Sequence, residues 1–410
     1  MSVVVRKTPG EASGPPLAAG TYATAAWWTI LAFAASIPAE AALVIPGYGS
    51  LTRAIGAVML IVVALDLTAR GRLGTGGFAV WCAWGLTAWA LMSVSWSLDP
   101  PLSVERAFTY AQLAVMLSIL LIYVDAPGRI TQLLQAYLLG VVCTSVSLLM
   151  NYSATSFVNL AITDVRISAF GWNPNEQGLT LIAGLPWALY TARTHARPAM
   201  RALALVAIAL LAISAVLTAS RAAFVALALT GAGMLWMLAD ARVSAKIFAL
   251  VVLLAVAVGG YALVPQLIWD RLFTVGARLQ SMDLNNRLPA WAAGIQYFED
   301  SPVGGIGAGA FQAASARVID IERSSHNSFL GVLVETGVVG AAMFSALIGH
   351  VLKCSMELPK ALRRAMLATL IPMFVGMVVT AWDYRKVPWF FFAIAIAACR
   401  LRDLPEPDRA

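Results

Sequence analysis

The chain has 410 residues, of which 60% are hydrophobic and 12% are charged, and its formal net charge is +7. Soluble domains carry about a quarter charged residues, so this composition excludes an ordinary soluble domain and indicates a polytopic membrane protein. The basic residues are spread over short segments between apolar runs, which favours anionic membrane lipids as their partners and argues against nucleic-acid binding.

Apolar windows of about 17 to 25 residues recur along the chain, each long enough to cross a hydrocarbon core of about 30 Å. They lack the period-two alternation of a barrel, so we expect an all-α fold. Before them, residues 1–20 read as a disordered cytoplasmic tail. We predict about twelve transmembrane helices, near residues 23–45, 51–69, 77–96, 105–124, 130–151, 178–194, 201–219, 222–239, 246–264, 327–351, 365–381 and 386–400.

These spans divide the chain into regions. Residues 21–264 contain spans 1 to 9, residues 265–326 form one large loop domain between spans 9 and 10, residues 327–402 contain spans 10 to 12, and residues 403–410 form a second tail. Most basic residues fall on one side of this arrangement, which by the positive-inside rule places both termini in the cytoplasm and the loop domain outside. The short external loops hold only Arg53, Arg106, Arg166, Arg221, Arg385 and Lys386.

Arg221 lies between two apolar runs with almost no loop separating them. An arginine near hydrocarbon costs about 2.5–3.5 kcal/mol on insertion scales, so such a residue is usually functional or paired. The alternative is that Arg221 extends from a tight hairpin to the membrane surface.

The loop domain contains a helix start at Asn285–Trp291, with an asparagine cap and Pro289 in the first turn. Arg287 in that turn opposes the helix dipole unless an external anion binds there; the alternative is contact with lipid phosphate. The glycine-rich run Gly304–Phe311 lacks the Lys-Ser/Thr of a P-loop, so we expect a tight turn or close helix packing.

His326 stands where the polar loop domain meets the next span, in Ser324-Ser325-His326-Asn327. A lone interfacial histidine is more often structural than catalytic. Its surroundings of hydroxyls, an amide and arginines nevertheless make it the best candidate for a general base in this chain.

As an ordered set, these motifs resemble the O-antigen ligase family. The set comprises the arginine at an external helix end, Arg287 followed by Trp291, Ser301–Gly307, His326-Asn327 and Glu335-Thr336-Gly337. The resemblance is sharpest over residues 285–340. It implies a GT-C-like membrane glycosyltransferase of the bacterial inner membrane that transfers O-antigen from undecaprenyl diphosphate to lipid A-core in the periplasm, with no metal and no cofactor.

The chemistry expected of such an enzyme assigns roles to the candidate residues. His326 would deprotonate an acceptor hydroxyl, and nearby guanidinium groups would hold it neutral by lowering its pKa. Arg221 and Arg287 would bind the diphosphate. Further substrate contacts are assigned to Arg166, Asn327 and Asp383.

Three alternatives remain from the sequence. An O-antigen polymerase uses the same donor with a second lipid-linked glycan as acceptor. A protein O-oligosaccharyltransferase is related but tends to be longer beyond the last span. A lipid-linked glycan transporter would place its charged groups near mid-membrane, whereas the outlying charges here gather on one predicted external face.

Overall fold

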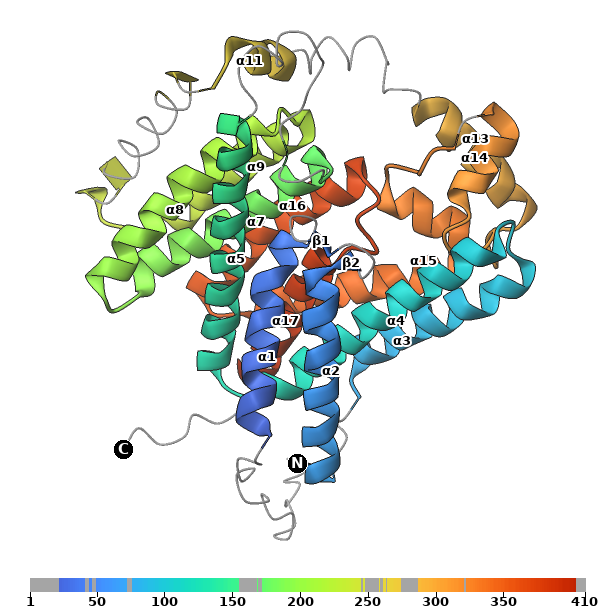
Figure 1. Cartoon of the computed structure of the whole chain (residues 1–410), viewed down its shortest axis with the longest axis horizontal. Helices are drawn as coiled ribbons and strands as arrows, with labels where there is room; N and C mark the ends of the chain where they lie inside the picture. The colour runs from blue at the N-terminus through green and yellow to red at the C-terminus, as the bar shows by residue number, and fades with distance from the viewer. Residues whose placement is uncertain are drawn as a thin grey trace, which may run out of the picture.

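The computed structural model describes residues 22–40, 44–45, 49–71, 76–154, 168, 172–244, 246–247, 258, 261–262, 264–273, 287–320 and 322–402. Within these residues the chain is a bundle of helices, which confirms the predicted all-α class (Figure 1). One small antiparallel hairpin is added, in which β1 (Val44–Ile45) pairs with β2 (Gly49–Ser50).

The helices in chain order are α1 (Ala23–Ser36), α2 (Leu51–Arg70), α3 (Phe78–Met92), α4 (Pro100–Tyr123), α5 (Pro127–Ala154), α7 (Pro174–Thr194), α8 (Pro198–Leu217), α9 (Arg221–Met237), α11 (Gln266–Phe273), α13 (Arg287–Asp300), α14 (Phe311–Ile319), α15 (Ser328–Glu357), α16 (Lys360–Val379) and α17 (Lys386–Arg402). Two short 3-10 helices, η1 (Ile37–Ala39) and η2 (Ser93–Trp96), extend α1 and α3.

Among the described residues, seven helices are long and apolar enough to cross a membrane, and two shorter apolar helices span Ala23–Ala39 and Arg221–Met237. Eleven of the twelve predicted spans overlap helices of the structure. Most of the twelfth, 246–264, lies outside the described residues, and its described residues 246–247, 258 and 261–262 are helical. The membrane-helix character is therefore confirmed, and the number of spans stays a prediction.

The first predicted span, 23–45, is too long. α1 ends at Ser36, and the chain turns through η1, because Pro38 has no N–H to continue the helix. The carbonyls released at this end accept hydrogen bonds from neighbouring helices: Thr52 Oγ1 donates to Ser36 O at 2.9 Å and Thr144 Oγ1 donates to Pro38 O at 2.9 Å. The break is thus satisfied inside the protein.

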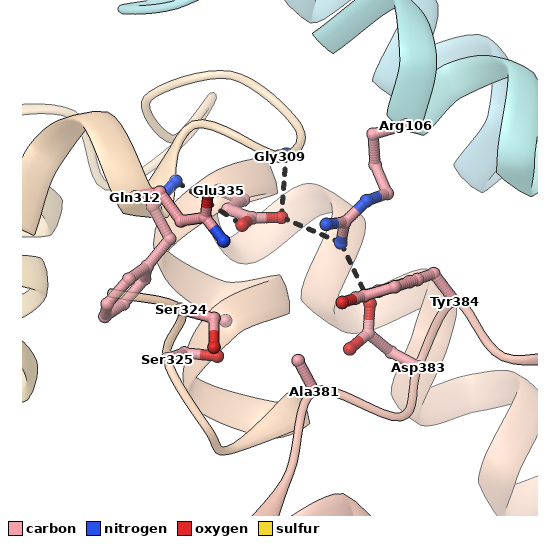
Figure 2. A pocket seen from close by; sticks show the side chains of 11 residues that line it. Arg106, Gly309, Gln312, Ser324, Ser325, Glu335, Ala381, Asp383 and Tyr384 are labelled. Atoms are coloured by element: carbon pink, nitrogen blue, oxygen red, sulfur yellow. Dashed lines mark hydrogen bonds and ion pairs between the residues drawn. The ribbon is translucent and has the colours of Figure 1, made fainter. Parts of the chain in front are cut away.

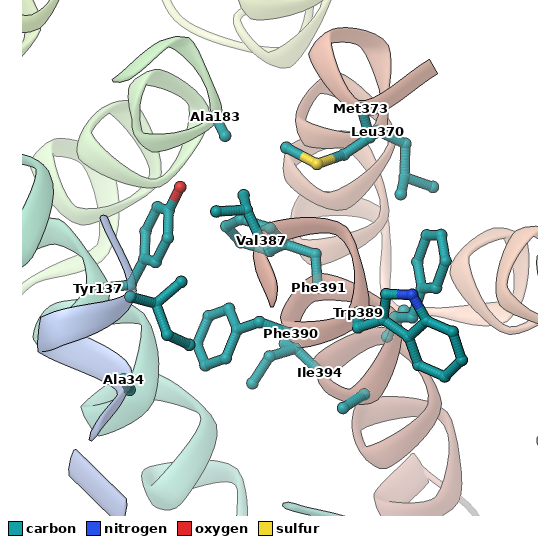
Figure 3. Close-up of a cluster of buried hydrophobic side chains, with 14 of the residues drawn as sticks. Ala34, Tyr137, Ala183, Leu370, Met373, Val387, Trp389, Phe390, Phe391 and Ile394 are labelled. Atoms are coloured by element: carbon teal, nitrogen blue, oxygen red, sulfur yellow. The ribbon is translucent and has the colours of Figure 1, made fainter. Parts of the chain in front are cut away.

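The core is centred on α17, whose residues from Val387 to Cys399 are all buried. Figure 3 shows its aromatic side chains facing Tyr137 of α5 on one side and α16 on the other. Phe391 stacks on Trp187 of α7 with ring centroids 6.4 Å apart, and Phe390 stacks on Tyr137 at 5.5 Å. Because other helices surround α17, its position is fixed, and so is the loop that precedes it.

Ion pairs join helix ends that the sequence placed on the same side of the membrane. At one end, Lys360 and Arg364 of α16 pair with Asp240, just after α9, at 2.8 and 2.6 Å. At the other end, Arg385, just before α17, pairs with Glu176 of α7 at 2.9 Å. The alternating course of the helices agrees with the prediction; which end faces the periplasm stays a prediction.

α13 and α14 gather at one end of α15, α3 packs along α15, and α4 packs along α3 (Figure 1). α13 begins at Arg287 and ends at Asp300, close to the predicted range of this helix. These five helices carry most of the site described next.

Candidate active site

α15 is interrupted two turns after it begins. Gly337 has φ 63° and ψ −170°, which breaks the helical hydrogen-bond ladder. The glycine-rich segment at 302–309 replaces those bonds: Ile306 N donates to Val334 O and Gly307 N to Glu335 O, both at 3.0 Å. In return, Val338 N donates to Pro302 O at 2.9 Å. A break in an apolar helix is tolerated only when its backbone is satisfied in this way.

Two glycines make this contact possible. A Cβ on Gly337 would lie 2.1 Å from Val303 O, and a Cβ on Gly305 would lie 2.5 Å from Glu335 O. Both residues also have positive φ, which side-chain-bearing residues rarely adopt. The predicted tight turn with close helix packing is thereby confirmed, and its partner is the broken helix α15.

The break holds the carboxylate of Glu335 in a buried position. Its Oε2 accepts from Gly309 N at 2.8 Å, and its Oε1 accepts from Phe311 N, at the start of α14, at 3.4 Å. Arg106 Nη1 of α4 lies 3.5 Å from Oε2. Backbone donors and one guanidinium thus fix this side chain.

The same guanidinium reaches Asp383, in the loop between α16 and α17. Arg106 Nη1 lies 3.6 Å from Asp383 Oδ2, and Tyr110 Oη donates to that oxygen at 2.8 Å. The Tyr384 ring lies against Arg106, with Cζ 3.7 Å from the ring centroid. We call Arg106, Glu335 and Asp383 the carboxylate cluster.

The loop that carries Asp383 is tied to the first residue of α15. Ser328 Oγ accepts from Trp382 N at 2.7 Å and from Asp383 N at 3.1 Å, and it donates to Thr380 O at 3.1 Å. Trp389 Nε1 donates to Asp383 O at 2.6 Å. Three separate segments of the chain therefore meet at the carboxylate cluster with little freedom.

A pocket opens beside the carboxylate cluster (Figure 2). The empty space at this place, open solvent included, is about 320 Å³. Besides the cluster itself, it is lined by Gly309, Phe311, Gln312, Ser324, Ser325, Gly331, Ala381 and Tyr384. The pocket thus contains carboxylates, hydroxyls and an amide, and Ser324 and Ser325 connect it directly to His326.

His326 follows this pocket in the chain and has a strained backbone, with φ 45°. A non-glycine residue in the left-handed region costs about 1–2 kcal/mol, and such strain gathers at functional sites. The segment is held by α13, because Trp291 Nε1 donates to Ser325 O at 2.6 Å. Burial of the imidazole, reinforced by the charges of Arg287 and Arg323, lowers the pKa of His326 to about 4.

Arg287, Arg323 and His326 therefore act on one another electrostatically, and we call them the histidine cluster. Arg287 is the first residue of α13, as the sequence predicted. The structure brings together the predicted base and one predicted phosphate ligand. It adds Arg323, which the sequence reasoning did not single out.

Arg221 begins α9, where Ser220 is the N-cap. The residues beside it join the same face of the bundle: Ser220 Oγ donates to Asn175 Oδ1 at 2.7 Å, and neighbouring Glu176 pairs with Arg385. Burial opposes the charge of Arg385, but Glu176 outweighs it and raises the pKa of Arg385. The α8–α9 hairpin is thus connected through α7 to the Asp383 loop.

The remaining predicted site residues have varied positions. Asp383 lines the pocket. Asn327 is the N-cap of α15, with its Oδ1 accepting from Leu330 N at 3.1 Å, so part of its side chain has a structural task. Arg166 lies outside the described residues. The substrate-binding roles of all three stay predictions.

The sequence reasoning missed Arg106 and the carboxylate of Glu335 as members of this site. The available signal was an arginine two residues into a predicted span, since a charge there needs a partner. Its partners are distant in sequence, so the pairing itself was not visible. Among the described residues, no group of three or more His, Cys, Asp or Glu side chains is placed to hold a metal ion.

The sequence also matches a known protein family. A family model described as O-antigen ligase matches residues 206–345, which include Arg221, Arg287, His326 and Glu335. Curated proteins give no match. The matched segment contains the break in α15 at Gly337 and the histidine cluster, while Arg106 and Asp383 lie outside it. The resemblance of this membrane protein to the O-antigen ligase family is therefore supported over residues 206–345.

Proposed function

We propose that the chain is an O-antigen ligase, which transfers a glycan from undecaprenyl diphosphate to a sugar of lipid A-core on the periplasmic face of the inner membrane. The observation that carries the proposal is that a half-buried, uncharged histidine is close enough to two arginines to feel their charge, and that it directly follows two serines that line a polar pocket. The family match over the same residues supports it.

The reaction requires one bond to form and one to break. The acceptor hydroxyl oxygen attacks the anomeric carbon of the donor, the bond from that carbon to the phosphate oxygen breaks, and undecaprenyl diphosphate leaves with the electron pair. The hydroxyl proton passes to His326. Direct displacement of this kind inverts the anomeric carbon.

His326 suits the role of base because it is neutral at pH 7. Its pKa of about 4 means that no proton must be removed before it accepts one. A base with so low a pKa is weak, but the bound diphosphate would place negative charge beside it. That charge would raise the pKa of His326 toward the working pH, where general bases are most effective.

The arginines would stabilise the leaving group. Arg287 and Arg323 stand beside His326 and would meet the diphosphate where negative charge develops. Guanidinium groups suit this task because they stay charged and bind phosphate through two parallel hydrogen bonds. Arg221, at the start of α9, is proposed as a further diphosphate ligand.

The deciding experiment mixes purified protein with undecaprenyl-diphosphate glycan and lipid A-core, without nucleotide or added metal, and follows the products by gel mobility. We expect a shifted lipid A-core band with the native protein. His326→Ala should lower the rate at least about 100-fold, the lower bound for loss of a general base. His195→Ala is the matched control, because His195 follows the end of α7 that contacts the end of α9 through Arg193 and Met237 O, away from the pocket.

The products separate the alternatives. If longer glycans form on the lipid carrier and the lipid A-core band does not shift, the protein is a polymerase and not a ligase. Neither product would favour a transporter, which needs two compartments to act. Normal transfer by His326→Ala would remove this histidine from the base role.

A further inference from the structure

The pocket beside His326 has more negative than positive groups in its wall. Two carboxylates, Glu335 and Asp383, share the single guanidinium of Arg106, so their formal charges sum to −1. The histidine cluster next to it has the opposite sign, from Arg287 and Arg323. A diphosphate is attracted to the histidine cluster and repelled by the pocket, so the two regions suit different parts of the reaction.

Asp383 has an oxygen available to a ligand. Its Oδ2 is used by Tyr110 and Arg106, while Figure 2 shows the other oxygen pointing away from Arg106, toward the space between Ser325 and Ala381. The carboxylate is held from behind by groups that do not enter that space. It therefore presents a fixed hydrogen-bond acceptor.

The other lining groups complete a surface for a neutral, hydroxyl-rich ligand. Gln312 and Ser324 add an amide and a hydroxyl on the side opposite Asp383 (Figure 2). A sugar ring donates and accepts hydrogen bonds around its edge, which such mixed groups match.

The position of the pocket fits the geometry of displacement. Ser324 and Ser325 line it, and the proposed base, His326, is the next residue in the chain. The arginines that would hold the leaving group belong to a separate cluster. In-line displacement needs the attacking hydroxyl and the leaving group on opposite sides of the anomeric carbon, and the two clusters offer separate places for them.

We propose that this pocket is the acceptor subsite, in which the terminal sugar of the acceptor donates a hydroxyl hydrogen bond to Asp383 and contacts Ser324 and Gln312. The proposal rests on the proposed function, since it names where the acceptor of that transfer binds. Arg106 and Glu335 are positioning residues that hold Asp383 and the pocket wall.

The test measures the two substrates separately. Binding of delipidated core oligosaccharide to the protein is titrated calorimetrically without donor, and the KM for lipid A-core and for the donor is then measured by transfer. Asp383→Asn should weaken oligosaccharide binding and raise the acceptor KM about 10- to 100-fold, as expected for the loss of a hydrogen bond to a charged group. The donor KM should change less than about twofold, since the diphosphate contacts lie elsewhere.

Two further variants serve as a control and as a second test of the subsite. Asp240→Asn makes the same chemical change at an exposed ion pair far along the chain from the pocket and should leave both KM values unchanged. Gln312→Ala, at an exposed residue of the pocket wall, should raise the acceptor KM less than Asp383→Asn and tests the subsite if that variant does not fold.

Equal losses for donor and acceptor, or no change in either, would overturn the acceptor assignment. Absence of transfer by the native protein would count against the proposed function alone, because the oligosaccharide titration tests the subsite without any reaction. Oligosaccharide binding that Asp383→Asn and Gln312→Ala both leave intact would place the sugar elsewhere.

Discussion

The carboxylate cluster and the histidine cluster are neighbours, yet they are built in different ways. Glu335 and Asp383 are almost fully buried, at 5% and 2% exposure, and backbone N–H groups, Tyr110 and Arg106 surround them. His326 is half-buried in a strained backbone, beside charges of its own sign when protonated. One cluster is a fixed part of the fold, and the other stores electrostatic and backbone strain.

This difference predicts different results from substitution. Changes to the supports of the carboxylate cluster should act first on folding, because buried charges without partners are costly. Changes to the histidine cluster should act first on reaction, because removing one of two like charges relieves repulsion in the free protein.

The largest effect is expected at the break in α15. Gly337→Ala places a methyl group 2.1 Å from Val303 O at a positive φ, so the glycine-rich turn must move away from Glu335. Backbone strain and overpacking together should cost about 3 kcal/mol or more. The measurement is the apparent Tm in detergent, followed by tryptophan fluorescence.

Gly349→Ala provides the matched control in the same helix. Nothing lies within 4 Å of a Cβ at that position, so alanine should leave stability unchanged or increase it by up to about 1 kcal/mol. If Gly337→Ala and Gly349→Ala have the same apparent Tm, the close approach at Gly337 does not hold the carboxylate cluster in place.

A smaller effect, confined to reaction, is expected at Arg287. Arg287→Gln should raise the donor KM about 10- to 100-fold through loss of charged hydrogen bonds to phosphate, with little change in Tm. Arg287→Lys should restore only part of the loss, because lysine cannot bind phosphate bidentately.

Arg317→Gln is the control for Arg287. Arg317 lies on neighbouring α14, and within the described part of the chain its guanidinium contacts only a backbone carbonyl, that of Leu98. It should leave the donor KM unchanged. Full activity of Arg287→Lys would show that charge alone is needed. A fall in Tm with Arg287→Gln would show that this arginine supports the fold. It would contradict the expectation that changes to the histidine cluster act on the reaction before they act on folding.

The contrast also explains which features were predictable from sequence. The helices, the start of α13, the tight α8–α9 hairpin and the packing role of the glycine-rich run follow from hydropathy, capping residues and glycine content, which are local properties. Arg287 and His326 were found because they share one polar window. Arg106 and Asp383 are 277 residues apart in the sequence (383 − 106), so only the folded chain reveals their contact.

The smallest effect is a shift in pH dependence. The pKa of His326 in the folded protein, about 4, lies below the ordinary value of 6.5, so the imidazole is neutral and ready to accept a proton until the pH falls to about 4. Arg323→Gln removes one repelling charge and should move the acid limb of log kcat/KM to higher pH. The new limb should stay below 6.5, because burial, the largest cause of the lowered pKa, is unchanged.

The same pKa fixes the sign of the effect on stability. As the pH falls from 6.5 toward 4, the unfolded chain takes up a proton that the folded protein does not, so acidification destabilises the fold over that interval. Arg323→Gln should therefore narrow the pH interval over which acid destabilises the fold. It should also move the acid limb of log kcat/KM to higher pH. Measuring Tm and kcat/KM between pH 4 and 7 would detect both changes. If the acid limb does not move, it reports the titration of a group other than His326. The proposal that the histidine cluster carries out the proton transfer would then be wrong.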